Sequence, residues 1–292
     1  MCTRNYNGYG VRDNFPLRDM SLSEFKHLLD PVLPHPKFML SLCGTYGDPA
    51  ANKNCTEILE YIHTVYPHVE IIMSSNASMK TPAWWAKLAE FTNLKIEFAL
   101  DGLADTHSIY RQNTNWHKII ENATAYIDAG GFAIWQFIKF DHNKHQLEQC
   151  KQMSKDIGFA EFKHFDDNRA NGLAFTPDGD PFVLGTPSEE ITSVMQFVEQ
   201  EKYLQRQYEL NLQEEYVRDL SVDSIECYSQ EGNIYVAVNG DVWPCCWLGG
   251  TFPMTSDSDN GWQLKNLPLV INGLENSLEE VIASWNHISD TW

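Results

Sequence analysis

The sequence predicts an α/β fold in which strands alternate with helices around a parallel sheet or barrel. Short apolar runs begin at residues 38, 69, 95, 132 and 160, at intervals of 31, 26, 37 and 28 residues, which is the spacing of successive strand–helix–strand units. Capped segments of helical length lie between these runs. Polar turns rich in Gly, Asn and Asp follow three of the runs, at the strand ends where such sheets bind ligands.

The N-terminal part predicts one helix and then a strand–loop–helix unit. Ser21 and Glu24 form a capping box, and the helix ends before Pro31 because proline disfavours helical geometry at the residue before it. The run 38–43 is a short buried strand that ends in a Gly-rich turn. A helix over 56–65 follows, because its apolar residues share one face: Ile58, Leu59, Ile62 and Val65.

The next unit has the same order of elements. A strand over 69–73 and a polar turn at 74–77 precede a helix that Thr81 caps and that begins with Pro82. A strand over 95–100 then leads into a polar stretch that extends to Arg111. The remaining elements of this part are a helix from about Trp116 to Gly130, a strand over 132–140, a helix near 145–157 and a strand over 160–164.

After about residue 165 the pattern changes. A polar loop leads to an acidic stretch over 188–220, which we expect to be helical. Asn239-Gly240 lies between apolar runs, which is a strong hairpin signal, and Ser277 with Glu280 caps a final helix. We therefore expect a strand–helix domain over 1–165, a linker with an acidic helix over 166–220, and a small hairpin domain over 221–292.

The charge balance excludes some classes of partner. The 292 residues contain 21 Lys and Arg against 40 Asp and Glu, so the formal net charge of −19 repels nucleic acids and anionic membranes. The chain has no apolar run of about 18 residues and no apolar stretch of a secretory signal near its start, so we expect a cytoplasmic protein. With 43% hydrophobic residues, it can bury a sizeable core.

The seven cysteines do not resemble the disulfide framework of a small secreted protein. The predicted hairpin brings Cys227 near Cys245 and Cys246, and thiolates select zinc or iron–sulfur centres. The alternative, that these cysteines only fill space in a core, stays open on the spacing alone. Cys43, Cys55 and Cys150 lie in a predicted strand or helices, and we expect them to be buried.

Several short motifs occur in an order that resembles a known family. They are Cys2-Thr-Arg4, Tyr46-Gly-Asp-Pro49, Ser75-Asn76, Leu100-Asp-Gly102 with His107 and Arg111, and the hairpin from Cys227 to Cys246. In this order they resemble a radical S-adenosylmethionine (SAM) protein with a SPASM or twitch type C-terminal domain. The resemblance covers nearly the whole chain. It implies a partial (β/α)6 barrel that lacks its first strand, joined to a small auxiliary-cluster domain.

The resemblance implies two cofactors. A 4Fe-4S cluster leaves one iron open to chelate SAM, and an electron from the cluster breaks a carbon–sulfur bond to form a radical that abstracts hydrogen from the substrate. Cys2 corresponds to the third cluster cysteine, and the other two would lie before Met1. A single thiolate cannot hold such a cluster. We therefore expect a fragment or mis-assigned start, or a natural truncation, with the strand over 38–43 left at an exposed edge.

The resemblance also implies roles for the turn residues. Gly47, between Tyr46 and Pro49, lets the backbone approach the methionine end of SAM, and Asp48 accepts its ammonium protons. Ser75 and Asn76 contact the ribose, and Arg111 pairs with the carboxylate. Ala99 stands where the family has a serine, and His107 is supporting sequence only. Each motif taken alone is equally an ordinary polar turn.

At the hairpin, the resemblance implies an auxiliary iron–sulfur cluster on Cys227, Cys245 and Cys246, with zinc or an empty hairpin as alternatives. We expect a radical SAM enzyme that abstracts a hydrogen atom from a peptide or small-molecule substrate and receives its electron from a reductase. The alternative is a non-catalytic remnant that binds SAM or a peptide and carries zinc or no metal at the hairpin.

Overall fold

A computed structural model describes residues 5–6, 9–11, 17–42, 44, 47–166, 173–175, 181–184, 234–243 and 271–285. The chain divides into two compact units. One unit comprises Arg18–Leu173 and Val183–Thr186, and the other comprises Met1–Leu17, Ala174–Phe182 and Pro187–Trp292.

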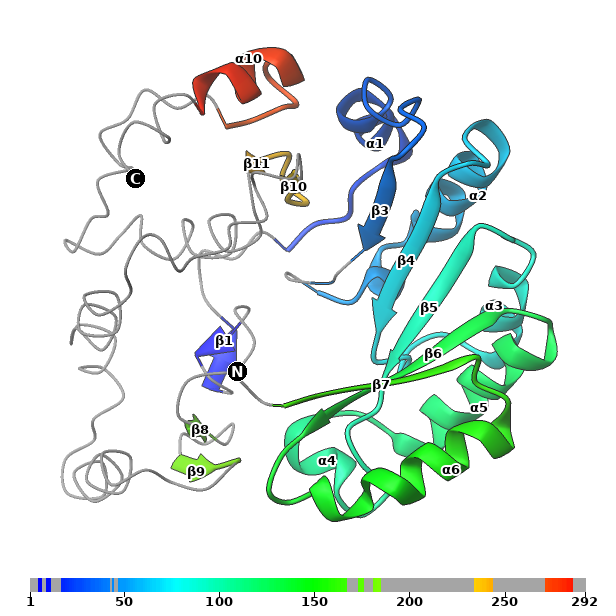
Figure 1. Ribbon diagram of the computed structural model, residues 1–292. Helices are drawn as coiled ribbons and strands as arrows, with labels where there is room; N and C mark the ends of the chain where they lie inside the picture. Colours follow the sequence, from blue (N-terminus) through cyan, green and yellow to red (C-terminus); the bar gives the residue numbers. More distant parts are fainter. Residues whose placement is uncertain are drawn as a thin grey trace. The chain divides into compact units, whose positions relative to one another are not determined.

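The first unit contains a five-stranded sheet in the order β3-β4-β5-β6-β7, and all neighbouring strands are parallel (Figure 1). This confirms the predicted α/β fold and its five strands. The prediction that the strand over 38–43 is buried is wrong, because the residues of Met39–Leu42 are exposed or half-buried. Their bounds are β3 (Met39–Leu42), β4 (Glu70–Ser75), β5 (Leu94–Ala99), β6 (Phe132–Lys139) and β7 (Glu161–Asp166). The described sheet is open, with β3 and β7 as its edges, so β3 is the edge strand that the sequence predicted.

Helices connect the strands, and α2, α3, α5 and α6 lie along one face of the sheet (Figure 1). The helices of this unit are α1 (Leu22–Leu29), α2 (Cys55–Val65), α3 (Pro82–Leu88), α4 (His107–Tyr110), α5 (Trp116–Asp128) and α6 (Leu147–Ile157). Between this layer and the sheet lies an aromatic core. In it Phe98 of β5 packs 5.6 Å from Trp85 and 6.0 Å from Tyr126, measured between ring centroids. All three side chains are fully buried, which fixes the helices against the strands.

The helix ends follow the capping signals in the sequence. The Ser21 hydroxyl accepts from the Glu24 backbone N–H while the Glu24 carboxylate accepts from the Ser21 N–H, which confirms the predicted capping box of α1. At the start of α3 the Thr81 hydroxyl accepts from the Trp84 backbone N–H, with Pro82 at the first helical position. Gly158 ends α6 with a left-handed backbone at φ 101°. Local sequence therefore determines where these helices begin and end.

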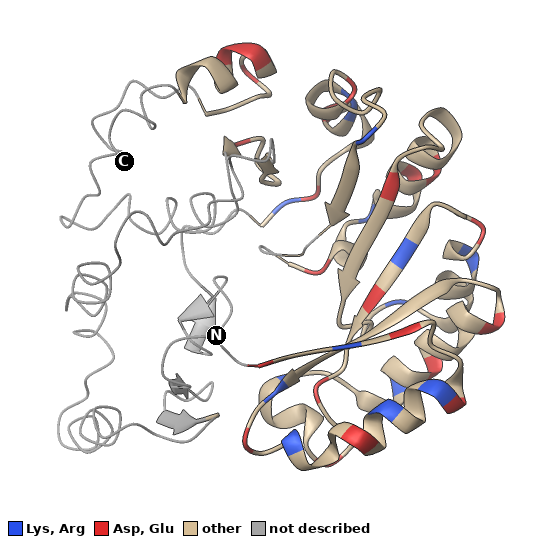
Figure 2. Cartoon of the chain, viewed as in Figure 1, with Lys and Arg blue, Asp and Glu red and all other residues tan. Residues whose placement is uncertain are grey.

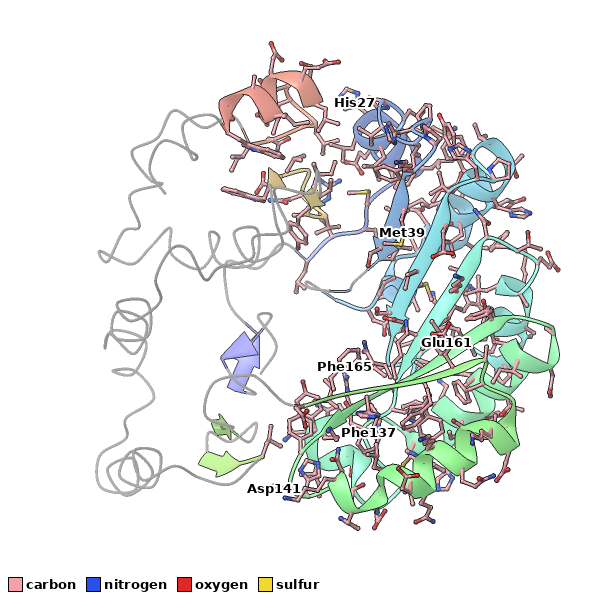
Figure 3. The ribbon with its side chains drawn as sticks, in the orientation of Figure 1. His27, Met39, Phe137, Asp141, Glu161 and Phe165 are labelled. Carbon is pink, nitrogen blue, oxygen red and sulfur yellow. The ribbon has the colours of Figure 1, made fainter. Side chains whose placement is uncertain are left out.

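Charged residues recur along β4, β5 and β7 (Figure 2). In β5, Lys95 and Glu97 alternate with the buried Ile96 and Phe98, so the two charged residues lie on the face opposite the helices. Lys95 pairs with Glu70 at 2.5 Å, while Glu97 accepts from the Ser74 hydroxyl at 3.0 Å and pairs with Lys163 at 3.3 Å. Met39 and Phe165, which lie on the two edge strands, are 55% and 48% exposed (Figure 3). Parallel sheets are usually covered by helices on both faces and are therefore apolar on both. This sheet differs, because the face opposite its helices is polar.

The second unit contains the predicted hairpin. Strands β10 (Tyr235–Val236) and β11 (Val242–Trp243) are antiparallel, with Tyr235 opposite Trp243, so Asn239-Gly240 lies in the connection as the sequence predicted. Helix α10 (Leu278–Ser284) begins with the predicted capping box of Ser277 and Glu280. The remaining strands form two short sheets, which are β1 (Asn5–Tyr6) with β2 (Tyr9–Val11), and β8 (Leu173–Phe175) with β9 (Pro181–Val183).

One predicted helix has no counterpart among the described residues. The acidic helix over 188–220 lies outside the described residues. Within the described ranges, no helix combines the length and the apolar character needed to cross a membrane.

Candidate functional site

The predicted SAM-binding turns follow three neighbouring strands. Gly47, Asp48 and Pro49 come after β3, Ser75 and Asn76 end and follow β4, and the loop from Asp101 to Arg111 follows β5. Because these strands are parallel and adjacent, their carboxyl ends meet at one edge of the sheet, where α/β folds bind ligands. The other predicted site residues lie outside the described residues: Cys2, Tyr46, Cys227, Cys245 and Cys246.

Asp48 connects the ends of β3 and β4. Its carboxylate accepts from the Ser75 hydroxyl at 2.8 Å and from the Asn76 backbone N–H at 2.9 Å. It also accepts from the Ala50 N–H at 2.9 Å and so caps the short 3-10 helix Pro49–Ala51. The side chain is therefore held in one orientation by groups from two strand ends.

Competing effects act on the ionisation of Asp48. Burial raises the pKa of this carboxyl above its ordinary value, and the hydrogen bonds from Ser75, Asn76 and Ala50 oppose that shift. The positive charge of Arg111 also lowers the pKa of Asp48. This effect acts between two strand ends, since Asp48 follows β3 and Arg111 follows β5.

The backbone before Asp48 requires glycine at one position. Gly44 has φ 64°, and a Cβ atom there would lie 2.8 Å from the Gly47 carbonyl oxygen. The Gly47 N–H donates to the Gly44 carbonyl at 3.2 Å, which closes the turn. Glycine thus permits the chain to turn sharply from β3 into the site.

The turn after β4 is also internally bonded. The Ser75 hydroxyl, which donates to Asp48, accepts from the Ala77 N–H at 2.9 Å, and the Asn76 side-chain oxygen accepts from the Ser78 N–H at 2.9 Å. Ala77 has φ 51°, an uncommon backbone conformation for a residue with a Cβ atom. In the structure the Ser75 hydroxyl orients Asp48, and its contact with a ribose stays a prediction.

After β5, Asp101 and Arg111 form a buried ion pair. The Arg111 Nε atom lies 2.6 Å from Asp101 Oδ2, and the side chain of Asp101 is fully buried while that of Arg111 is 24% exposed. Asp101 Oδ1 accepts from the Ile138 backbone N–H at 2.6 Å, which ties the pair to β6. The guanidinium carbon also lies 5.0 Å from the centre of the Tyr110 ring.

His107 completes this loop. Its Nδ1 atom accepts from the Asp101 backbone N–H at 3.2 Å, so the imidazole is neutral and its proton is on Nε2. Burial lowers the pKa of His107 to about 4, against an opposing effect from the charge of Asp101. His107 therefore holds the backbone of the site as a neutral side chain.

A further polar layer was not identified from the sequence. Asn143 donates to the Asp101 carbonyl at 3.2 Å and to the Ile138 carbonyl at 2.9 Å. Gln146 accepts from the Leu103 N–H at 2.9 Å and from the Thr106 hydroxyl at 2.5 Å. Both residues follow β6. One sequence signal points to them: polar residues after a parallel strand lie at the edge where the strand ends meet.

The described cysteines are buried thiols. Cys55 and Cys150 are free and buried, and burial raises the pKa of each thiol to about 12, so both stay protonated at neutral pH. This confirms their predicted burial, whereas Cys43 lies outside the described residues. Within the described part of the chain, no group of three or more His, Cys, Asp or Glu side chains is arranged to hold a metal ion.

Comparison with known proteins identifies a shared fold. No protein-family model matches the sequence, and no curated protein matches it. Among solved structures, SuiB from Streptococcus suis aligns with a TM-score of 0.60 and 13% identity over 91% of this chain and 60% of SuiB. The chain therefore spans about three fifths of the length of SuiB, and at this identity the likeness shows the fold alone.

Two liganded structures of the same protein also align. SuiB bound to S-adenosylmethionine has a TM-score of 0.58 and 12% identity, over 94% of this chain and 63% of SuiB. SuiB bound to the precursor peptide SuiA has a TM-score of 0.52 and 12% identity, over 86% of this chain and 57% of SuiB.

Proposed function

We propose that this chain binds SAM at the carboxyl ends of β3, β4 and β5, as part of a radical SAM enzyme that modifies a peptide. The observation that carries the proposal is that Asp48 is hydrogen-bonded to the end of β4 while Arg111 is held by Asp101 at the end of the neighbouring strand β5. The order of the motifs supports it. So does the fold shared with SuiB, which was solved with SAM and with a precursor peptide.

The residues at this edge fit the polar groups of SAM. Asp48 accepts hydrogen bonds and suits the ammonium group, while the guanidinium of Arg111 suits the carboxylate. The side-chain amide of Asn76 suits the ribose hydroxyls, and Ser75 holds Asp48 in place. When bound in a radical SAM enzyme, SAM supplies a deoxyadenosyl radical after reductive cleavage of a carbon–sulfur bond.

The charges are also complementary. With Asp48 ionised, Asp101 and Asp48 carry two negative charges against the positive charge of Arg111, which leaves one negative charge at the site. SAM has a sulfonium, an ammonium and a carboxylate, and therefore one net positive charge. S-adenosylhomocysteine lacks the sulfonium charge, and we expect it to bind more weakly than SAM because its attraction to the site is smaller.

Among the residues of the given sequence, Cys2 alone corresponds to a ligand of the catalytic 4Fe-4S cluster. Cys2 is the only cysteine in the first 42 residues, whereas such a cluster needs several thiolate ligands. We therefore derive no cleavage step, and the proposal for the residues of this chain is SAM binding. An auxiliary cluster on Cys227, Cys245 and Cys246 stays a prediction, as does the peptide substrate.

Isothermal titration calorimetry with SAM tests the binding proposal. We expect Arg111→Met to weaken SAM binding by a factor of about ten or more, because a hydrogen bond to a charged group contributes about 1.5–3 kcal/mol. Lys155→Met is the matched control, since Lys155 is an exposed cation on α6. Absence of SAM binding to the unmodified chain, or equal affinities of the two variants, would contradict the proposal.

A further inference from the structure

We propose that Asp101 is a positioning residue that presents Arg111 to the carboxylate of a bound amino-acid-type ligand. This inference rests on the proposed function and deepens it, because it states what orients the cation that recognises the methionine end of SAM. Asp101 itself is fully buried and acts on the ligand through Arg111.

Three hydrogen bonds connect Asp101, His107 and Arg111 in a closed ring. The Asp101 N–H donates to His107 Nδ1 at 3.2 Å, and the Arg111 N–H donates to the His107 carbonyl at 2.9 Å. Arg111 Nε then donates to Asp101 Oδ2 at 2.6 Å. Both the backbone and the side chain of Arg111 are therefore fixed relative to the end of β5.

The neighbours of Asp101 prevent the carboxylate from moving. The carboxylate oxygen Oδ1 of Asp101 accepts from the Ile138 N–H at 2.6 Å. The backbone carbonyl oxygen of Asp101 accepts from the Asn143 side chain at 3.2 Å. The next residue, Gly102, has φ 118°, and a Cβ atom there would lie 2.1 Å from the Thr106 hydroxyl oxygen. The loop thus has little room to change its conformation.

The contact uses one particular nitrogen of Arg111. A guanidinium has five N–H donors in a rigid plane, and Asp101 contacts Nε, the donor nearest the side-chain stem. The ring of Tyr110 lies 5.0 Å from the guanidinium carbon, which adds a second constraint on that plane. An Nε contact fixes the direction of the two terminal nitrogens, and a fixed, planar pair of donors is what a ligand carboxylate needs for bidentate binding.

Two ligands distinguish a positioning role from a structural one. SAM has the carboxylate, whereas 5′-methylthioadenosine has the adenosine and sulfur but lacks the amino-acid end. In calorimetry with the full chain, we expect Asp101→Asn to weaken SAM binding about tenfold and to change methylthioadenosine binding less than twofold. The asparagine keeps the size of the side chain, and its single oxygen can still accept from the Ile138 N–H. Its NH2 group then faces Arg111 Nε, and because both groups are donors the contact that orients Arg111 is lost.

A double-mutant cycle tests whether Asp101 acts through Arg111. In an Arg111→Met background, Asp101→Asn should not weaken SAM binding further, because the cation that it positions is absent. The double variant contains neither charge of the ion pair, so it leaves no unpaired charge buried. It therefore controls for misfolding of the single variants.

The outcomes separate the two proposals. Equal weakening of SAM and methylthioadenosine binding by Asp101→Asn, or further weakening in the Arg111→Met background, would overturn the positioning role. If the unmodified chain binds neither ligand, the proposed function itself fails. The Nε proton of Arg111, observed by ¹⁵N NMR, gives a readout without ligand. This proton should exchange slowly with water in the unmodified chain and rapidly in Asp101→Asn. Rapid exchange in both proteins would overturn the inference.

Discussion

The hydroxyl of Ser75 lies 2.9 and 2.8 Å from the two carboxylate oxygens of Asp48, and it thereby joins the ends of two parallel strands. The contact spans 27 residues of sequence. Since Ser75 is buried, loss of this donor would leave Asp48 poorly solvated. The position of Asp48 in the site therefore depends on the end of β4.

Ser75→Ala should lower the stability of the fold. Removal of a buried hydrogen-bond donor to a carboxylate is expected to lower the free energy of unfolding by about 1–3 kcal/mol. Thr92→Ala, which removes an exposed hydroxyl in the turn before β5, should change it by less than about 0.5 kcal/mol. Urea denaturation followed by circular dichroism measures the free energy of unfolding of both variants. Equal stabilities of the two variants would contradict the role of Ser75.

SAM affinity should depend on pH through Asp48. Burial raises the pKa of this carboxyl above its ordinary value of 3.8, so Asp48 gains a proton as the pH falls through the raised pKa and loses its attraction for the ammonium group. SAM affinity should therefore decrease as the pH is lowered from neutral through this raised pKa. Asp48→Asn should bind more weakly at pH 7 and vary less with pH, and a parallel decrease in both proteins would exclude Asp48 as the cause.

Acid should destabilise the fold through His107. The pKa of His107 is about 4 in the folded chain and 6.5 in its ordinary state, so the unfolded chain binds more protons between these values. Stability is therefore lost as the pH falls from 6.5 towards 4, by up to about 3 kcal/mol. Denaturation at several pH values should give this slope for the unmodified chain. His107→Asn keeps an acceptor for the Asp101 N–H and should flatten the slope, and an unchanged slope would assign it to other groups.

Gly102→Ala should be more damaging than Gly130→Ala. Both glycines have a positive φ, at 118° and 91°, so both substitutions introduce backbone strain. A Cβ atom at Gly102 also meets the Thr106 hydroxyl at 2.1 Å, whereas nothing lies within 4 Å of one at Gly130. We expect Gly102→Ala to lower the free energy of unfolding by at least about 1 kcal/mol more than Gly130→Ala. Equal losses would show that the loop after β5 adjusts freely.

The sequence was sufficient to predict the order of strands and helices in the first unit because its signals are local. Capping boxes at Ser21 and Ser277, Pro82 after Thr81, and the regular spacing of apolar runs each specify an element without reference to the rest of the chain. The parallel arrangement then followed from strand spacing, which also placed the turns after β3, β4 and β5 at one edge.

The contacts within the site could not be predicted in the same way. The sequence predicted ligand contacts for Asp48, Ser75 and Arg111. The pairing of Ser75 with Asp48 and of Arg111 with Asp101 depends on side-chain directions that only the packed sheet determines. Asn143 lies 42 residues from Asp101, and no local pattern links the two. Hydrogen bonds between separate loops are thus the part of the site that requires a structure.

A crystal structure of the chain with SAM is the measurement that tests the central claim most directly. We expect the amino-acid end of SAM between Asp48 and Arg111, with the ammonium group within hydrogen-bond distance of Asp48 and the carboxylate contacting the terminal nitrogens of Arg111. SAM bound elsewhere, or with its carboxylate away from Arg111, would contradict the account.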